Sequence, residues 1–140
     1  ALFLNMGSKS IYENEEETSS DILIVKSLGI LPTLYADAQL AFVGGSLVNR
    51  GGHNIIEPAI AQCPFILGEH YFNFKNIVES FINANATCIV RTPLDIFKVF
   101  CKTYKNQDDF RAGMIRNANT VVEKNIGATM RQLSLIRASL

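Results

Sequence analysis

Short apolar runs alternate along this chain with segments of helical periodicity, and this alternation restricts the possible folds more than any other feature. Five of these apolar runs have the length of a β-strand, and none is long enough to span a bilayer. We therefore expect strands at residues 1–6, 22–25, 39–43, 64–67 and 87–90. The segments between them repeat apolar residues at helical spacing, which predicts helices near 27–38, 55–62, 74–84 and 94–104. Strands that alternate with helices favour a Rossmann-like α/β fold, in which helices flank a parallel sheet.

The rest of the chain adds a loop and a helical end to this pattern. The polar, acidic residues 7–20 predict an exposed loop. Helical spacing continues after residue 107, and Asn125 and Gly127 predict a break between helices at 107–123 and 127–139. The 140 residues, of which 48% are hydrophobic and 19% charged, suit one folded domain with one core.

Charge is distributed unevenly although the net charge is zero. Residues 1–97 hold ten acidic and five basic side chains, whereas residues 98–140 hold three acidic and eight basic ones. This distribution fits a solvated surface with helical ion pairs, or a basic face near anionic lipid or an acidic partner. Nucleic-acid binding is not favoured, because the basic residues are not interleaved with aromatic ones. Cys63, Cys88 and Cys101 lack the spacing of metal ligands, so we expect reduced thiols and no metal site.

The segment FVGGSLVNRGGHNIIEP, residues 42–58, places four glycines within nine positions directly after an apolar run. The loop should leave the carboxyl end of the predicted strand 39–43, which is where α/β sheets bind ligands. Glycines at its start would let a ligand approach the main chain, and glycines at its end would let the chain turn into the next helix.

Polar residues of the same segment could complete a nucleotide site. The next helix would offer free N–H groups to an anion, Ser46 a hydroxyl, and Arg50 a charge-assisted contact to phosphate or carboxylate. Glu57, in the first helical turn, could accept hydrogen bonds from ribose hydroxyls. Together these groups suggest a site for a nucleotide monophosphate or diphosphate.

Each of these residues also has a purely structural interpretation. Asn54 and Glu57 have the spacing of a capping box. His53 could bond to a loop carbonyl, Arg50 could be a solvated charge, and the first glycines could serve only close packing of strand and helix. The segment is neither a P-loop, since no Lys-Ser or Lys-Thr follows the glycines, nor a GxGxxG fingerprint.

A second polar cluster, GEHYFNF at residues 68–74, follows the predicted strand 64–67. It should lie beside the glycine loop at the same sheet edge, where His70 and Asn73 could line a pocket. The alternative is that Asn73 caps the next helix. The sequence shows no nucleophile elbow and no set of metal-ligating residues.

In this order and at this spacing, the two segments resemble the 3-deoxy-D-manno-octulosonic acid (Kdo) transferases of lipopolysaccharide synthesis. That family carries Gly-Gly-Ser, then Gly-Gly-His-Asn-x-x-Glu, and a little later Gly-Pro-His-x-Phe-Asn-Phe. The resemblance runs from residue 22 to the end of the chain. It covers the C-terminal half of the family's length.

The resemblance implies that residues 1–140 form the C-terminal, nucleotide-sugar (donor) domain of a two-domain GT-B glycosyltransferase. Such an enzyme would transfer Kdo from CMP-Kdo to the lipid A precursor (lipid IVA) in lipopolysaccharide core synthesis, with inversion and without a metal or other cofactor. The general base and acceptor site would belong to the missing N-terminal domain, so this chain would hold no catalytic residue and be inactive alone. The implied location is the cytoplasmic face of the bacterial inner membrane, with peripheral membrane contact.

The motifs and the chemistry of the loop together predict a donor-binding set. It comprises Gly44, Gly45, Ser46, Arg50, Gly52, His53, Asn54, Glu57, His70 and Asn73.

The sequence also departs from the family pattern. Residues 26–31 lack two acidic residues that the family tends to have before the following helix, so a donor contact from those carboxylates has no counterpart here. Glu69 replaces the usual Pro and Tyr71 the usual Thr. An added carboxylate beside an anionic donor is unfavourable unless it points away.

The sequence is also compatible with two other functions. One is a GT-B transferase or epimerase that uses a UDP-sugar, since such enzymes also place glycines before a helix with an acidic ribose ligand. The other is a non-catalytic nucleotide-binding domain. Competition between CMP and UDP, and binding without transfer, would separate them from a Kdo transferase.

Overall fold

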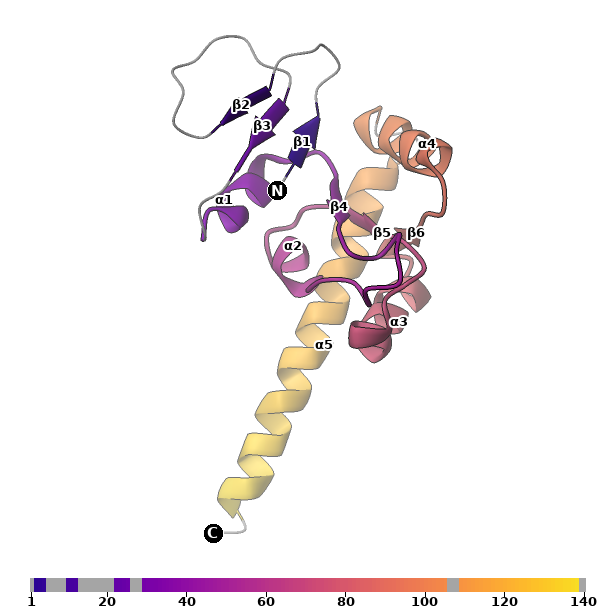
Figure 1. Ribbon diagram of the computed structural model, residues 1–140. Coiled ribbons are helices and arrows are strands. Elements are labelled where there is room, and N and C mark those ends of the chain that lie inside the picture. The colour runs from indigo at the N-terminus through magenta and orange to yellow at the C-terminus, as the bar shows by residue number, and fades with distance from the viewer. Residues whose placement is uncertain (1, 5–9, 13–21, 26–28, 106–108, 139–140) are drawn as a thin grey trace. The chain divides into compact units, whose positions relative to one another are not determined.

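The computed structural model describes residues 2–4, 10–12, 22–25, 29–105 and 109–138 (Figure 1). The chain divides into two compact units, Ala1–Leu34 and Tyr35–Leu140. In the first unit, three strands form a sheet of order β1-β3-β2, in which β1 pairs antiparallel and β2 parallel with β3. These strands are β1 (Leu2–Leu4), β2 (Ser10–Tyr12) and β3 (Ile22–Ile24).

The second unit contains a parallel sheet of order β4-β5-β6. Its strands are β4 (Ala41–Val43), β5 (Phe65–Leu67) and β6 (Thr87–Ile89). The central strand, β5, is buried along its whole length, because neighbouring strands and helices enclose it. All three strands run the same way, so the loops that follow them begin at one edge of the sheet.

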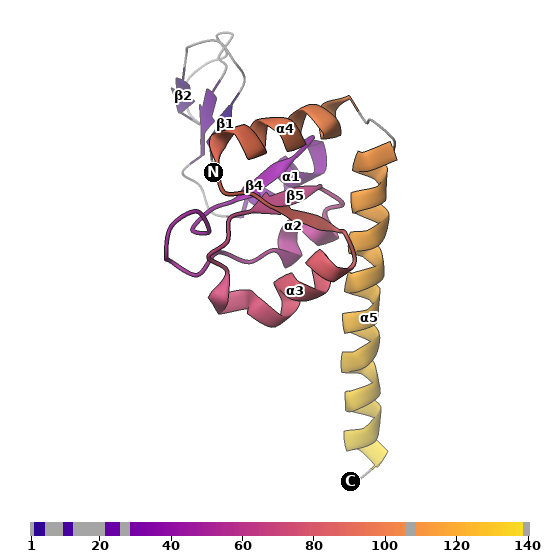
Figure 2. The ribbon, with the colours of Figure 1, turned by 90° about the vertical axis from the view of Figure 1, so that its right-hand side faces the viewer.

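Helices lie on both faces of this sheet. In Figure 2, α4 lies above the strands, α2 and α3 lie below them, and α5 runs along one side. The helical elements are α1 (Leu31–Asp37), α2 (Ile56–Ile60), the 3₁₀ turn η1 (Phe72–Phe74), α3 (Lys75–Asn83), α4 (Pro93–Tyr104) and α5 (Phe110–Ala138).

One sheet face packs on α2, α3 and α5 and forms the core of the second unit. Phe65 of β5 and Phe81 of α3 are both fully buried, and their rings meet edge to face with centroids 5.4 Å apart. Ile55, Val78 and Val121 bring the neighbouring segments into the same cluster. This burial fixes the strand ends from which the candidate site is built.

The α/β class and most predicted elements are confirmed, and three expectations are wrong. Two of the five predicted strands pair in a separate sheet with antiparallel β1 and β3, not in one continuous parallel sheet. Residues 10–12 are a strand within the segment predicted as loop. Helix α5 continues without a break through Asn125, whose amide donates to the carbonyl of Val121 at 2.8 Å, and through Gly127. One glycine costs a helix only about 1 kcal/mol, so the main-chain hydrogen bonds of the remaining helix can outweigh this cost.

Cys63 provides a test of this core. Its thiol is buried, and that burial raises its pKa to about 11 from the ordinary 9.0. In the unfolded chain the thiol ionises near its ordinary pKa, so the stability linked to the protonated thiol is complete below about pH 9. This stability is lost as the pH rises toward about 11. We expect the loss to reach roughly 2–3 kcal/mol, because one pKa unit corresponds to about 1.4 kcal/mol.

Urea unfolding at pH values of about 8 and about 11 would measure this effect, with Cys63→Ala as the comparison. The variant should be less stable at the lower pH because it leaves a cavity, but its stability should fall less with pH. Equal falls for both proteins would contradict an elevated pKa of the Cys63 thiol.

Candidate functional site

Two loops meet at the carboxyl edge of the parallel sheet. The glycine loop, residues 44–52, leaves β4, and residues 68–71 leave the adjacent strand β5. The main-chain N–H of His70 donates to the carbonyl of Ser46 at 2.9 Å, and that of Asn73 donates to the carbonyl of Gly51 at 3.2 Å. The predicted proximity of the two motifs is therefore confirmed.

The conformation of the glycine loop explains three of its glycines. Gly45, Gly51 and Gly52 have φ angles of 70°, 85° and 76°, a region that side chains disfavour. The Gly52 N–H donates to the carbonyl of Gly45 at 3.0 Å and closes the loop. A Cβ on Gly45 would lie 3.1 Å from the His53 ring, so the imidazole lies directly over the loop main chain.

The Ser46 side chain stabilises this loop from within the protein. The side chain is fully buried, and its hydroxyl donates to the carbonyl of Val43 and accepts the N–H of Gly68 at 2.8 Å. Donor contact by the Ser46 hydroxyl stays a prediction, but in this arrangement the hydroxyl is fully buried and joins β4 to the end of β5.

Asn54 and Glu57 do not form the predicted capping box. Helix α2 has Ile55 as its N-cap, with no side-chain cap bond. The Asn54 side-chain oxygen accepts the N–H of Ile56 at 3.0 Å, the local turn typical of asparagine. The Glu57 carboxylate is exposed and meets only the Asn54 amide, at 3.4 Å, among the hydrogen bonds of the described residues. It thus keeps lone pairs for a ligand.

Glu57 also acts on Tyr35, a half-buried residue of α1. The pKa of Tyr35 is raised, first by burial of the phenol and then by the nearby Glu57 carboxylate.

Helix α2 has only five residues, so few peptide dipoles add up at its start. The loop N–H groups and Arg50 are therefore the stronger candidates for an anion contact.

Most of the other predicted ligands face solvent. Arg50, His53 and Asn73 are exposed, and His70 is half-buried. Within the described part of the chain, the ion pairs do not include Arg50. The Asn73 amide donates to the carbonyl of Arg50 at 3.2 Å, and Phe74 is the N-cap of α3 with no side-chain bond. The alternative that Asn73 caps this helix is therefore wrong, because its amide joins the two loops instead.

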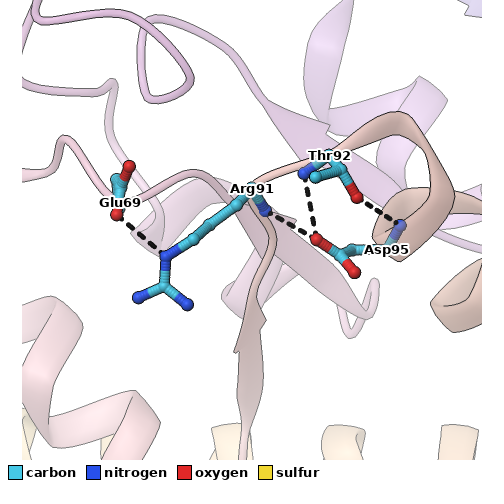
Figure 3. A network of polar contacts seen from close by, with 4 residues as sticks. All are labelled: Glu69, Arg91, Thr92 and Asp95. Atoms are coloured by element: carbon cyan, nitrogen blue, oxygen red, sulfur yellow. Dashed lines mark hydrogen bonds and ion pairs between the residues drawn. The ribbon is translucent and has the colours of Figure 1, made fainter.

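A polar network that the sequence did not predict lies at the same edge (Figure 3). Arg91 follows β6, and its Nε donates to the Glu69 carboxylate at 2.9 Å. The Asp95 carboxylate accepts the main-chain N–H groups of Arg91 and Thr92, and Thr92 in turn accepts the N–H of Asp95, which completes a capping box for α4. Hydrogen bonding with Thr92 and with the main-chain N–H of Arg91 lowers the pKa of Asp95. The position of Arg91 after a parallel strand was the sequence signal that could have revealed it.

The remaining features of the site bear on metals and membranes. Among the described residues, no group of three or more His, Cys, Asp or Glu side chains is arranged to hold a metal ion. No helix in the described ranges is both long and apolar enough to cross a bilayer. Of the departure at residues 26–31, residues 26–28 lie outside the described part of the chain.

The fold and these loops define an α/β domain of the Rossmann-like type, and comparison with known proteins specifies it further. The chain is 31% identical to a 3-deoxy-D-manno-octulosonic acid transferase of Haemophilus influenzae over 122 residues, which are 87% of this chain and 29% of that protein. It is 35% identical to the enzyme of that name from Bordetella pertussis over 120 residues, 83% of this chain and 27% of that protein. No protein-family model matches the chain.

A solved structure gives the same result. The C-terminal CMP-Kdo binding domain of WaaA from Acinetobacter baumannii is 30% identical, with a TM-score of 0.72 over 81% of this chain and 60% of that one. We therefore identify the chain as a homologue of the Kdo transferases, with the fold of this C-terminal domain of WaaA. It spans less than a third of the length of the two curated relatives.

Proposed function

We propose that this chain is the donor-binding domain of a GT-B Kdo transferase and that it binds CMP-Kdo. The observation that supports this most directly is the joining of the glycine loop to the loop after β5, which gathers the predicted ligands at one sheet edge. The relatives named Kdo transferase and the CMP-Kdo binding domain of similar fold support the choice of donor.

In this proposal each part of the site has a distinct task. The main-chain N–H groups of the glycine loop and the Arg50 guanidinium hold the phosphate and stabilise its charge as CMP departs. The exposed Glu57 carboxylate accepts hydrogen bonds from the ribose hydroxyls. His53 lies over Gly45, where it contacts the phosphate or the sugar, and His70 and Asn73 form the neighbouring wall.

The rest of the reaction requires groups outside this chain. A base in the other domain of the enzyme would deprotonate a hydroxyl of the lipid A precursor (lipid IVA), which would displace CMP directly and invert the anomeric carbon. No metal or other cofactor is needed if the loop and Arg50 stabilise the phosphate charge. The domain alone would then bind the donor without transferring it. A lipid acceptor would place the whole enzyme at the cytoplasmic face of the inner membrane, in peripheral contact with it.

An NMR titration of the 140-residue chain with CMP tests this function, with UDP and AMP as controls. We expect CMP to cause selective shifts from Gly44 to Glu57 at lower concentration than either control, because the proposed donor carries cytidine. A preference for UDP would instead favour a UDP-sugar transferase or epimerase. A folded spectrum without shifts for any nucleotide would contradict a donor site in this chain.

A further inference from the structure

Glu69 and Arg91 connect the ends of two neighbouring strands, next to the proposed donor site. Glu69 lies between Gly68 and His70, and the N–H groups of both neighbours bond to Ser46 of the glycine loop. The Glu69 main chain is thereby fixed one strand away from the loop. Adjacent strands are about 4.8 Å apart, so the carboxylate lies well within a Debye length of an anion held there.

The charges around this point do not favour another anion subsite. Arg91 is flanked by two carboxylates, those of Glu69 and Asp95, and Asp95 is already bound to the N–H groups that begin α4. Lys98 also acts on the Asp95 carboxylate, so the charges of these four side chains about balance and leave no excess of positive charge. The guanidinium is therefore better suited to offset the Glu69 charge than to attract a new ligand.

We infer that Arg91 is a positioning residue that pairs with Glu69 and keeps this sheet edge compatible with an anionic nucleotide in the glycine loop. The inference rests on the proposed function. Without Arg91, the Glu69 carboxylate would be unpaired beside the nucleotide phosphate, and like charges at this range repel. The pair is exposed, with side chains 67% and 50% accessible, so solvent and salt should weaken the effect without removing it.

A charge-rescue cycle tests this role on the 140-residue chain. Arg91→Gln, Glu69→Gln and the double variant are titrated with CMP and with cytidine, which lacks the phosphate. We expect Arg91→Gln to weaken CMP binding about two- to fivefold at an ionic strength of about 0.01 M, and less at about 0.15 M. Cytidine affinity should not change. The double variant should recover the CMP affinity of the wild type, because the unpaired carboxylate is gone.

Arg116→Gln is the matched control. Arg116 pairs with Asp109 at 2.6 Å near the start of α5, so this variant also removes one positive charge and leaves one carboxylate unpaired. It should not change CMP affinity by as much as Arg91→Gln does.

Three outcomes would overturn the inference. Equal weakening of cytidine and CMP binding by Arg91→Gln would indicate a structural role. Persistence of the loss of CMP affinity in the double variant would indicate direct contact between Arg91 and the nucleotide. If the wild-type chain itself fails to bind CMP, the proposed function fails and the inference fails with it, and this result differs from the other two.

Discussion

Gly68→Ala should prevent stable folding of the second unit or cost it several kcal/mol. A Cβ at this position would lie 2.2 Å from the carbonyl oxygen of Ser46 and 2.6 Å from the nitrogen of Leu47. Both atoms belong to the main chain of the glycine loop, so no side-chain rotation can relieve the clash. We expect a loss of about 3 kcal/mol or more in the free energy of unfolding, measured by urea denaturation.

Gly113→Ala is the control for this prediction. Gly113 lies within α5, and a Cβ there would meet only the end of the Arg116 side chain, at 3.9 Å. Alanine in a helix interior is favoured over glycine by about 0.5–1 kcal/mol, so this variant should be slightly more stable than the wild type. If the two variants had similar stabilities, the contact between the end of β5 and the glycine loop would not be a determinant of the fold.

Glu57→Gln should weaken CMP binding by roughly tenfold to a hundredfold with little change in stability. Hydrogen bonds to a charged group are worth about 1.5–3 kcal/mol, and about 1.4 kcal/mol corresponds to a factor of ten in affinity. The carboxylate is exposed and takes part in no cap of α2, so its loss should change the unfolding free energy by less than about 0.5 kcal/mol.

Isothermal titration with CMP and thermal melting of the same samples would measure both quantities. Glu79→Gln, on α3, removes an equal charge from a partly exposed helix position and should leave affinity near that of the wild type. Unchanged or tighter CMP binding by Glu57→Gln would rule out the proposed ribose contact. A lower melting temperature at constant affinity would point to a local structural role for Glu57.

Much of the fold could be predicted because it depends on local patterns. Apolar runs and helical spacing located β4, β5 and β6 and the helices between them. The predicted glycine loop has the positive φ angles that only glycine adopts easily, and the two motifs meet because adjacent parallel strands end at one edge. These features need only a few neighbouring residues to be specified.

Local patterns failed where several bonding partners were available. Asn54 and Glu57 have capping-box spacing, but the Asn54 oxygen bonds to the N–H of Ile56 instead. Asn73 precedes a helix and nevertheless donates its amide to the carbonyl of Arg50, 23 residues earlier in the sequence. The true capping box of α4, at Thr92 and Asp95, has the same kind of spacing. The spacing of residues indicates which hydrogen-bond partners are possible, and tertiary contacts decide which of them forms the bond.

The sequence by itself determined the α/β class, the glycine loop and the family resemblance, because all three are properties of short segments. Tertiary structure alone decided that the Ser46 hydroxyl is buried against Gly68 and that Glu69 pairs with Arg91. Each of these contacts joins residues 22 positions apart. No local preference can specify such a partner, since it depends on which strands lie side by side and on where each strand ends.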